Sequence, residues 1–300
     1  MRNVRTQSLI HYHFIVFIFG FSSILGALCS LDALPLVVYR MLLACVGLAL
    51  YFGLFHPSYF RLDKQLWPKV VLGGLIIGVH WLTFFHAIKV AGVSLTLSML
   101  ATGAFITAML EPLLNKRKIL LYELLFGGCI AVGVGIIFRA EYEHLYGICV
   151  ALVSALLSAV FTILNSQLVS KARPITLSFY ELLLGGILGL LVVLFSGQYT
   201  AADFQLQAWD ILWIVLLAWV CTSYAFNISL RVMQHLSPFT VMIIINLEPV
   251  YGIVLSLLIW GEEELMSGSF YFGFIIVLGT ILLNGYYQRR KLVREKQTHN

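Results

Sequence analysis

Ten apolar stretches divide this chain, and most of its Lys and Arg residues lie in every second gap between them. A helix needs about 20 apolar residues to cross the hydrocarbon core of a bilayer, and each stretch is about that long. Lipid offers the backbone no hydrogen-bond partners, so such segments must fold as helices. The sequence therefore predicts an all-α integral membrane protein with ten transmembrane helices, at 9–29, 35–55, 70–90, 94–114, 119–138, 145–165, 175–195, 210–230, 238–258 and 270–288.

The composition excludes an ordinary soluble domain, in which about a quarter of the residues are charged. Here 60% of the residues are hydrophobic and 11% are charged, with a mean hydropathy of +0.94. The net charge of +5 is explained by cytoplasmic anchors of membrane helices, so no nucleic-acid partner is expected. The five cysteines show no metal-binding spacing, and neither a metal nor another cofactor is predicted.

The distribution of positive charge predicts the orientation of the helices. With the N-terminus inside, only Lys89 and Arg139 fall in outside segments and Arg40 lies within a span, which leaves 16 of the 19 Lys and Arg residues inside. Positively charged loops remain on the cytoplasmic side of a membrane. We therefore expect a multi-pass protein of the cytoplasmic (inner) membrane with both termini in the cytoplasm.

Two parts of the chain resemble each other. The segment LVVYRMLL at 36–43 parallels LSFYELLL at 177–184, and FFHAIKV at 84–90 parallels FNISLRV at 226–232. Several matches in one order at one spacing indicate an internal repeat. Because five spans carry the chain to the opposite face, the second copy must be inverted. We predict five-helix repeats at 8–138 and 145–288, followed by a basic cytoplasmic tail at 289–300, with a binding site between the repeats near the membrane midplane.

Several short motifs point to a known family. They are FGFS at 19–22, the pair Tyr39–Arg40, FHAIK at 85–89, and NLEPVYGI at 246–253 followed by WGE at 260–262. With these motifs the chain resembles the EamA-type ten-helix permeases of the drug/metabolite transporter superfamily over nearly its whole length. The resemblance implies efflux or uptake of small metabolites, often amino acids, without specifying the substrate.

Glu248 is the first candidate for a functional residue. A charged side chain within a span is costly and indicates function by default. Glu248 lies ten residues from either end of its predicted span, which is about 15 Å from each surface. Pro249 follows it and frees a backbone carbonyl to meet a substrate or water. We predict that Glu248 binds substrate or a proton, with Asn246 nearby; the alternative is a neutral carboxyl bonded to a neighbouring helix.

The other candidate substrate-binding residues are Arg40, His80, Trp81, Glu181, Trp219 and Tyr224. Arg40 and Glu181 occupy equivalent positions in the two repeats, and Arg40 suits a substrate carboxylate. A histidine within the membrane can relay protons near neutral pH. The aromatic side chains are expected to line an apolar pocket. The structural alternatives are an Arg40 side chain that reaches the interface and aromatic residues that only pack or anchor the helices.

These observations favour a secondary active transporter that exports small metabolites such as amino acids by alternating access between the repeats. Motifs of metalloproteases, ATPases and serine hydrolases are missing from the sequence, so enzyme activity is not expected. The expected partners are a small-molecule substrate, protons, the lipid bilayer and a second copy of the chain in a homodimer. Two alternatives remain open: a membrane enzyme for a lipid-linked substrate, with His80 and Glu248 as acid and base, and a non-transporting membrane scaffold.

Overall fold

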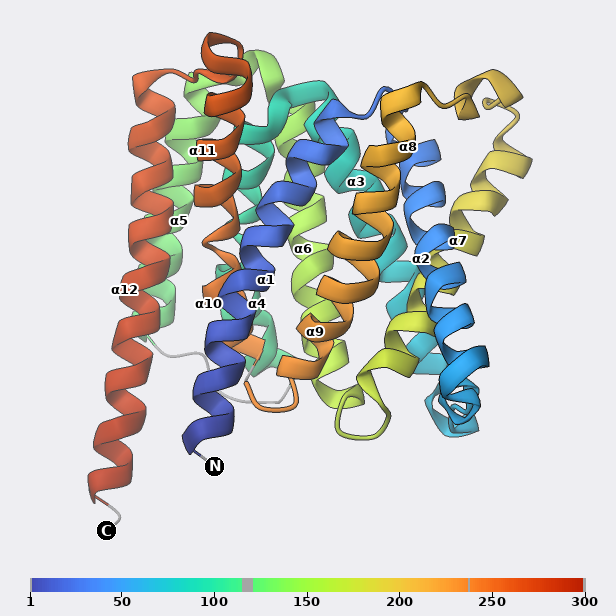
Figure 1. Cartoon of the computed structure of the whole chain (residues 1–300). Coiled ribbons are helices and arrows are strands. Elements are labelled where there is room, and N and C mark those ends of the chain that lie inside the picture. Colours follow the sequence, from blue (N-terminus) through green and yellow to red (C-terminus); the bar gives the residue numbers. More distant parts are fainter. Residues whose placement is uncertain (1, 115–120, 237, 299–300) are drawn as a thin grey trace.

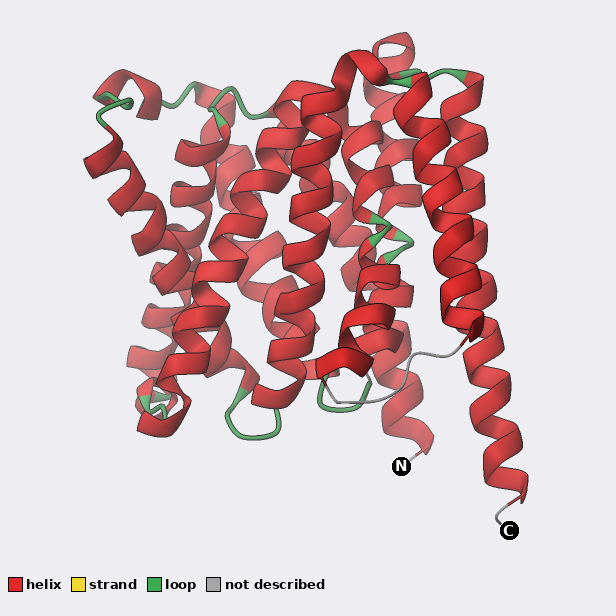
Figure 2. Ribbon diagram, turned by 180° about the vertical axis from the view of Figure 1, so that it is seen from behind, coloured by secondary structure: helices red, strands yellow, loops and turns green. Residues whose placement is uncertain are grey.

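The apolar stretches of the sequence form helices. The structure is a computed structural model that describes residues 2–114, 121–236 and 238–298. Within these ranges the chain contains helices, turns and loops but no strand (Figure 2). The helices form one bundle with their axes roughly aligned, and both ends of the chain lie at the same end of it (Figure 1). Three of the basic loop residues used to predict the orientation, Lys116, Arg117 and Lys118, lie outside the described residues.

The described residues contain twelve α-helices and six other helical segments. The α-helices are α1 (Arg2–Leu28), α2 (Ala33–Phe55), α3 (Trp67–Leu100), α4 (Gly103–Leu114), α5 (Leu121–Ala140), α6 (Leu145–Leu168), α7 (Pro174–Ser196), α8 (Ala208–Val215), α9 (Ala225–Val232), α10 (Pro238–Ile245), α11 (Glu248–Trp260) and α12 (Gly268–Thr298). A π-helix, η5 (Leu216–Tyr224), joins α8 to α9. Short 3₁₀ turns form η1 (Pro57–Phe60), η2 (Lys64–Leu66), η3 (Tyr142–His144), η4 (Ala201–Phe204) and η6 (Gly261–Glu264).

Seven helical segments in the described part of the chain are long and apolar enough to cross a membrane. They are Gln7–Leu28, Ala33–Phe55, Lys64–Leu100, Tyr142–Leu168, Pro174–Ser196, Ala208–Val232 and Gly268–Tyr287. The sequence predicts ten spans, and the difference arises where helices are broken or merged. The predicted spans 70–90 and 94–114 share α3 and α4, and 238–258 is divided between α10 and α11. Helix α5 contributes a shorter apolar segment, Leu125–Ala140.

A sharp bend within α3 separates two of the predicted spans. Gly92 adopts φ +79° and ψ 169°, a conformation that glycine reaches without the steric cost of a Cβ. Because of the bend, the first backbone N–H groups of the helical segment that follows have no acceptor within the helix. The carboxylate of Glu264, on η6, accepts hydrogen bonds from Val93 N at 2.9 Å and Ser94 N at 3.0 Å. Glu264 therefore caps this buried helix start from the second half of the chain.

Replacing Glu264 with alanine is expected to destabilise the protein by about 2 kcal/mol, because it leaves two buried N–H groups without an acceptor. The measurement is thermal unfolding of the purified protein in detergent. Glu262→Ala and Glu263→Ala are matched controls, since both side chains are exposed in the same turn. Equal melting temperatures for all three variants would contradict a capping role for Glu264.

Helices from the first and second halves of the chain pack directly against each other. α2 packs on α7, α3 on α6 and α7, α5 on α12, and α1 on α9 and α11. Small residues permit the closest of these approaches. A Cβ added to Gly78 of α3 would lie 3.0 Å from Gly185 Cα of α7, and one added to Gly133 of α5 would lie 2.9 Å from Gly273 O of α12. The glycines of the predicted spans thus bring the two halves into backbone contact.

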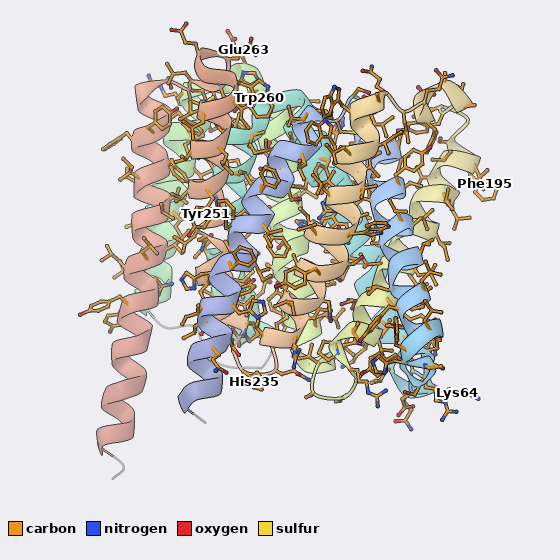
Figure 3. All side chains as sticks on the ribbon, viewed as in Figure 1. Lys64, Phe195, His235, Tyr251, Trp260 and Glu263 are labelled. Carbon is orange, nitrogen blue, oxygen red and sulfur yellow. The ribbon has the colours of Figure 1, made fainter. Side chains whose placement is uncertain are left out.

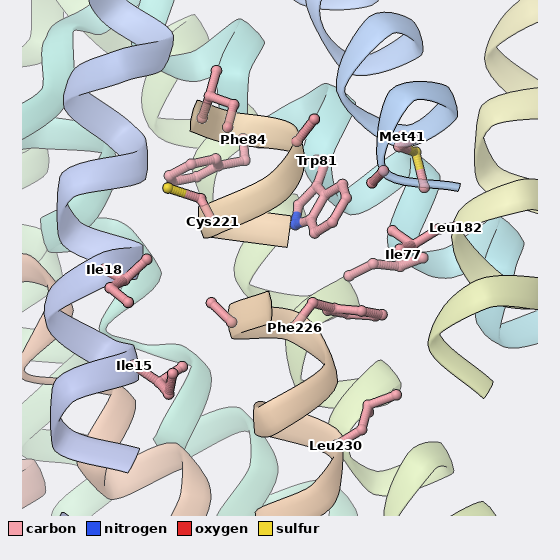
Figure 4. Packing of buried hydrophobic residues seen from close by; sticks show 14 of the residues in the cluster. Ile15, Ile18, Met41, Ile77, Trp81, Phe84, Leu182, Cys221, Phe226 and Leu230 are labelled. Atoms are coloured by element: carbon pink, nitrogen blue, oxygen red, sulfur yellow. The ribbon is translucent and has the colours of Figure 1, made fainter. Parts of the chain in front are cut away.

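The interior and the surface of the bundle are both apolar. Ile15 of α1, Met41 of α2, Trp81 of α3, Leu182 of α7 and Phe226 of α9 belong to one buried cluster (Figure 4). Large apolar side chains also cover the outside, as shown by Leu54, Leu194, Phe195 and Leu258, which are 73%, 72%, 83% and 77% exposed. Such a surface suits lipid rather than water.

Charged side chains are found at the two ends of the bundle. Lys64 lies at the end that holds the chain termini, and Glu263 lies at the opposite end (Figure 3). At the Glu263 end, Ser30 donates to Asp210 from both its backbone N and its hydroxyl, at 2.7 and 2.5 Å. Lys89 donates to the carbonyl of Cys29. The junction of α1 and α2 is thereby tied to both α8 and α3.

Candidate functional site

A cavity lies among helices from both halves of the chain. Helices α1, α2 and α3 line it from the first half, and α6, α9, α10 and α11 from the second. Most of the wall is apolar or aromatic, and the polar groups come from Tyr12, Ser22, Arg40, His80, Ser158, Thr162, Ser229, Asn246 and Glu248.

Arg40 is held in the cavity wall by the π-helix η5. Its side chain is only 2% exposed. Its Nε donates to Thr222 Oγ1 at 2.6 Å, and one terminal nitrogen donates to the carbonyl of Cys221 at 3.3 Å. The Thr222 hydroxyl in turn donates to Leu217 O, five residues earlier, at 2.7 Å. π-Helical turns are rare in proteins, and those that occur are often found at functional sites. This one positions a buried guanidinium.

An aromatic wall supports the guanidinium of Arg40. Its central carbon lies 4.1 Å from the ring centroid of Trp81 and 5.2 Å from that of Phe85. These distances allow cation–π attraction. Trp81 meets the ring of Phe226 edge-on at 5.6 Å. Glu248 also lines the cavity and is close enough to Arg40 for electrostatic interaction. The cavity therefore presents a guanidinium and a carboxyl group beside an aromatic surface.

Helix breaks bring irregular backbone to the cavity. Helix α10 ends just before Asn246, and α11 begins at Glu248, with Pro249 in its first turn. In the first half, α3 and α4 meet at Ala101, which also lines the cavity. Non-helical backbone at membrane depth is tolerated where it is enclosed by protein or faces a cavity. The two breaks lie next to each other in the cavity wall, since Ala101 packs in one cluster with Met242 and Ile245 of α10.

Two buried polar atoms in the cavity wall have no hydrogen-bond partner. They are Tyr12 Oη and Asn246 Nδ2. Both side chains are almost fully buried, with 0% and 1% of their surface exposed. Buried donors without acceptors are uncommon in folded proteins, because each carries an uncompensated desolvation cost. Both atoms are therefore available to a bound molecule that offers acceptors.

His80 has one ring nitrogen committed to the protein. Its Nδ1 lies 2.9 Å from the backbone carbonyl of Ser154, and the Ser154 hydroxyl donates to His80 O at 3.1 Å. Because a carbonyl only accepts hydrogen bonds, we assign the proton of the neutral ring to Nδ1. The Nε2 atom then carries the lone pair. In its neutral form His80 therefore offers Nε2 as an acceptor to this part of the site.

The structure brings together five of the residues that the sequence singled out. Arg40, His80, Trp81, Asn246 and Glu248 all line the one cavity.

The other three candidate residues lie away from the cavity. Trp219 and Tyr224 are 50% and 40% exposed on the outside of η5. The Tyr224 hydroxyl bonds to His11 Nε2 at 2.8 Å, which ties η5 to α1. Glu181 is fully buried on α7, against Gly73 of α3. These positions depend on which side of a helix faces the neighbouring helices, and the apolar sequences around them do not reveal it.

Sequence reasoning missed several residues of the site. Ser158 and Thr162 line the cavity from α6, and Thr222 holds Arg40. A signal for the first two was present, since Ser154, Ser158, Thr162 and Asn165 follow one another at helical spacing in an apolar helix. Thr222 gave no such signal, because its role depends on the π-helical turn.

Part of this chain is similar to known transporters. Residues 145–285 match the model of the EamA-like transporter family, which confirms the resemblance found in the motifs for this part of the chain. A relative from Archaeoglobus fulgidus, named "Uncharacterized transporter", is 30% identical over 121 residues, or 40% of this chain. The match spans 44% of that relative, so the chain aligns with less than half of its length. The protein is thus a multi-pass integral membrane protein whose residues 145–285 match the EamA-like transporter family.

A solved structure shows the same fold over almost the whole chain. Titled "Crystal structure of protein", it superposes with a TM-score of 0.65 and covers 94% of this chain and 96% of its own. The identity is 14%, so this likeness shows the fold alone. The fold match includes the first half of the chain, which the family model does not reach.

Proposed function

We propose that this protein is a secondary active transporter that exports small zwitterionic metabolites, amino acids among them, across the cytoplasmic membrane. The observation that carries the proposal is the presence of both Arg40 and Glu248 in one cavity that is lined by both halves of the chain. An amino acid carries a carboxylate and an ammonium group a few ångströms apart. Arg40 suits the carboxylate, since its guanidinium donates several hydrogen bonds in a plane. Glu248 suits the ammonium group.

The aromatic wall and the free donors complete this binding scheme. Trp81, Phe161 and Phe226 provide an apolar surface for a substrate side chain. Tyr12 Oη and Asn246 Nδ2 provide donors for substrate oxygens. A molecule with only one charge lacks one of the two pairings.

The architecture proposed for this transport is ten spans in two inverted five-helix repeats, 8–138 and 145–288. The two helix breaks, one between α3 and α4 and the other between α10 and α11, support it because they occupy corresponding places in the two halves. Rocking of one repeat against the other would open the cavity to either side in turn. Contacts between the halves through glycines permit such movement of helices against each other.

Transport is tested by counterflow in proteoliposomes that contain the full-length protein. The vesicles are loaded with a mixture of unlabelled amino acids, and the uptake of each radiolabelled amino acid is then followed. We expect exchange of at least one amino acid and none of its decarboxylated amine, which lacks the partner for Arg40. Equal uptake of amine and amino acid, or no uptake above that of empty vesicles, would contradict the proposal.

Both termini are expected to lie in the cytoplasm. The reason is that the basic loops fall on the same side of the membrane as the termini in the proposed topology, and basic loops remain in the cytoplasm. Reporter fusions after the C-terminus and within residues 262–264 should therefore report opposite compartments. The structure supports the design, since the chain termini and Glu263 lie at opposite ends of the bundle (Figures 1 and 3). The same compartment for both fusions would refute the proposed topology.

A further inference from the structure

Two connections between helices carry an excess of positive charge at the end of the bundle that Lys64 marks in Figure 3. One leads from α2 into α3 at 56–69, and the other leads from α6 into α7 at 165–176. Asp63 is the one acidic residue in the sequence of these two segments, and its carboxylate accepts a hydrogen bond from Gln65 N at 3.0 Å. The basic residues of the two segments are all exposed, and together we call them the basic surface: Arg61, Lys64, Lys69, Lys171 and Arg173.

Hydrogen bonds hold the two connections side by side. Thr176 Oγ1 donates to Tyr59 O at 2.9 Å, and Tyr180 Oη donates to Phe60 O at 2.6 Å. Lys69 Nζ donates to the Gln167 side chain at 3.2 Å, which ties the start of α3 to the end of α6. Positive charges from both halves of the chain are thereby collected in one place. Like charges repel each other there, and a bound anion would relieve that repulsion.

The guanidinium of Arg173 is positioned in advance for such an anion. Its Nη1 donates to Ser58 Oγ at 3.4 Å, and its central carbon lies 4.7 Å from the ring centroid of Tyr59. The Tyr59 ring is itself stacked on His56 at 4.6 Å. A guanidinium has five N–H donors, and the bond to Ser58 uses one of them. Its planar fork matches the oxygens of a phosphate group better than those of a monovalent halide.

Apolar and aromatic side chains border the basic surface. Leu54 and Phe55, at the end of α2, are 73% and 67% exposed, and Phe60 of η1 is 37% exposed. The rings of Trp67 and Tyr180 meet at 4.8 Å beside them. Trp and Tyr are enriched where the hydrocarbon core of a membrane meets the headgroups. The basic surface therefore lies at the edge of the lipid-facing side of the bundle.

We propose that the basic surface binds the headgroup of an anionic phospholipid. The headgroup phosphate contacts Arg173 and the neighbouring cations, and the acyl chains run past Leu54 and Phe55. A soluble anion matches the charge but not the apolar border, and a zwitterionic phospholipid brings a second positive charge to the cations. Clusters of about four to eight Lys and Arg residues next to a membrane helix are typical of anionic lipid binding.

Native mass spectrometry of the purified full-length protein in detergent, titrated with lipid, measures this binding without requiring transport. Phosphatidylglycerol is expected to bind about 10-fold more tightly than phosphatidylcholine with the same acyl chains. The variant that combines Lys64→Gln, Lys171→Gln and Arg173→Gln should lose this preference. The matched control combines Arg289→Gln, Arg290→Gln and Lys291→Gln. It removes the same charge from the C-terminal tail and should retain the preference.

Equal affinity of the wild type for the two lipids would overturn the proposal. An equal loss of preference in the tail variant would overturn it too, because binding would then follow overall charge. Displacement of phosphatidylglycerol by an equal concentration of inorganic phosphate would instead indicate a site for soluble anions. If the triple variant does not fold, Arg173→Gln alone decides, since an unchanged preference contradicts the phosphate contact. Absence of amino acid flux would refute the transport function and leave the lipid result standing.

Discussion

Arg40→Ala is expected to lower the affinity for amino acids by roughly 100-fold, because removing one partner of a buried charge pair typically costs about 3 kcal/mol. In the free protein the change also leaves the Thr222 hydroxyl and the Cys221 carbonyl without their donor. The measurement is the concentration dependence of counterflow in proteoliposomes, with the amount of inserted protein determined for each variant.

Arg40→Lys is the matched control for charge. Lysine retains the positive charge but lacks the planar guanidinium that lies over Trp81 and reaches Thr222. We expect an affinity between those of wild type and Arg40→Ala. If both variants transport amino acids with wild-type affinity, Arg40 only supports the packing of η5 and the proposed carboxylate site is wrong.

Glu248→Gln should insert and fold normally but bind amino acids about 30-fold more weakly. Glutamine preserves the size and the hydrogen-bonding capacity of a protonated glutamate, whereas it cannot pair as an anion with the substrate ammonium group. Loss of such a pairing in a site shielded from water costs about 2 kcal/mol or more. Binding is followed by thermal shift with the amino acid that shows counterflow. Unchanged affinity at normal expression would remove Glu248 from the binding site.

Much of the helical organisation can be predicted from the sequence because helix length and apolar composition are local properties. The predicted boundary between 70–90 and 94–114 coincides with the bend at Gly92. The break around Asn246 and Pro249 could also be expected, since proline cannot continue the hydrogen-bonding pattern of a helix. Five of the eight candidate site residues share the cavity because charged or polar groups within an apolar span are seldom placed there without a partner.

The remaining features depend on contacts between distant parts of the chain. The sequence places Arg40 and Glu181 at equivalent positions of two similar segments, yet Arg40 lines the cavity and Glu181 is enclosed behind it. Trp219 and Tyr224 were expected in the pocket, but the π-helix η5 directs Thr222 towards Arg40 and leaves them partly exposed. Whether a helical segment adopts the π-helical hydrogen-bonding pattern depends on the helices that pack against it, so this pattern cannot be predicted from composition.

The sequence by itself determined that this chain lies in a membrane, that it is helical, and which side chains are costly to bury there. These conclusions follow from transfer free energies of individual residues, which need no knowledge of neighbours. Only the tertiary structure decided which costly groups face each other. Arg40 meets Trp81 and Thr222, and Glu181 lies against Gly73 of α3, because helices far apart in sequence pack together. Partner identity is a property of packing, and it decides which buried polar group is available to a ligand.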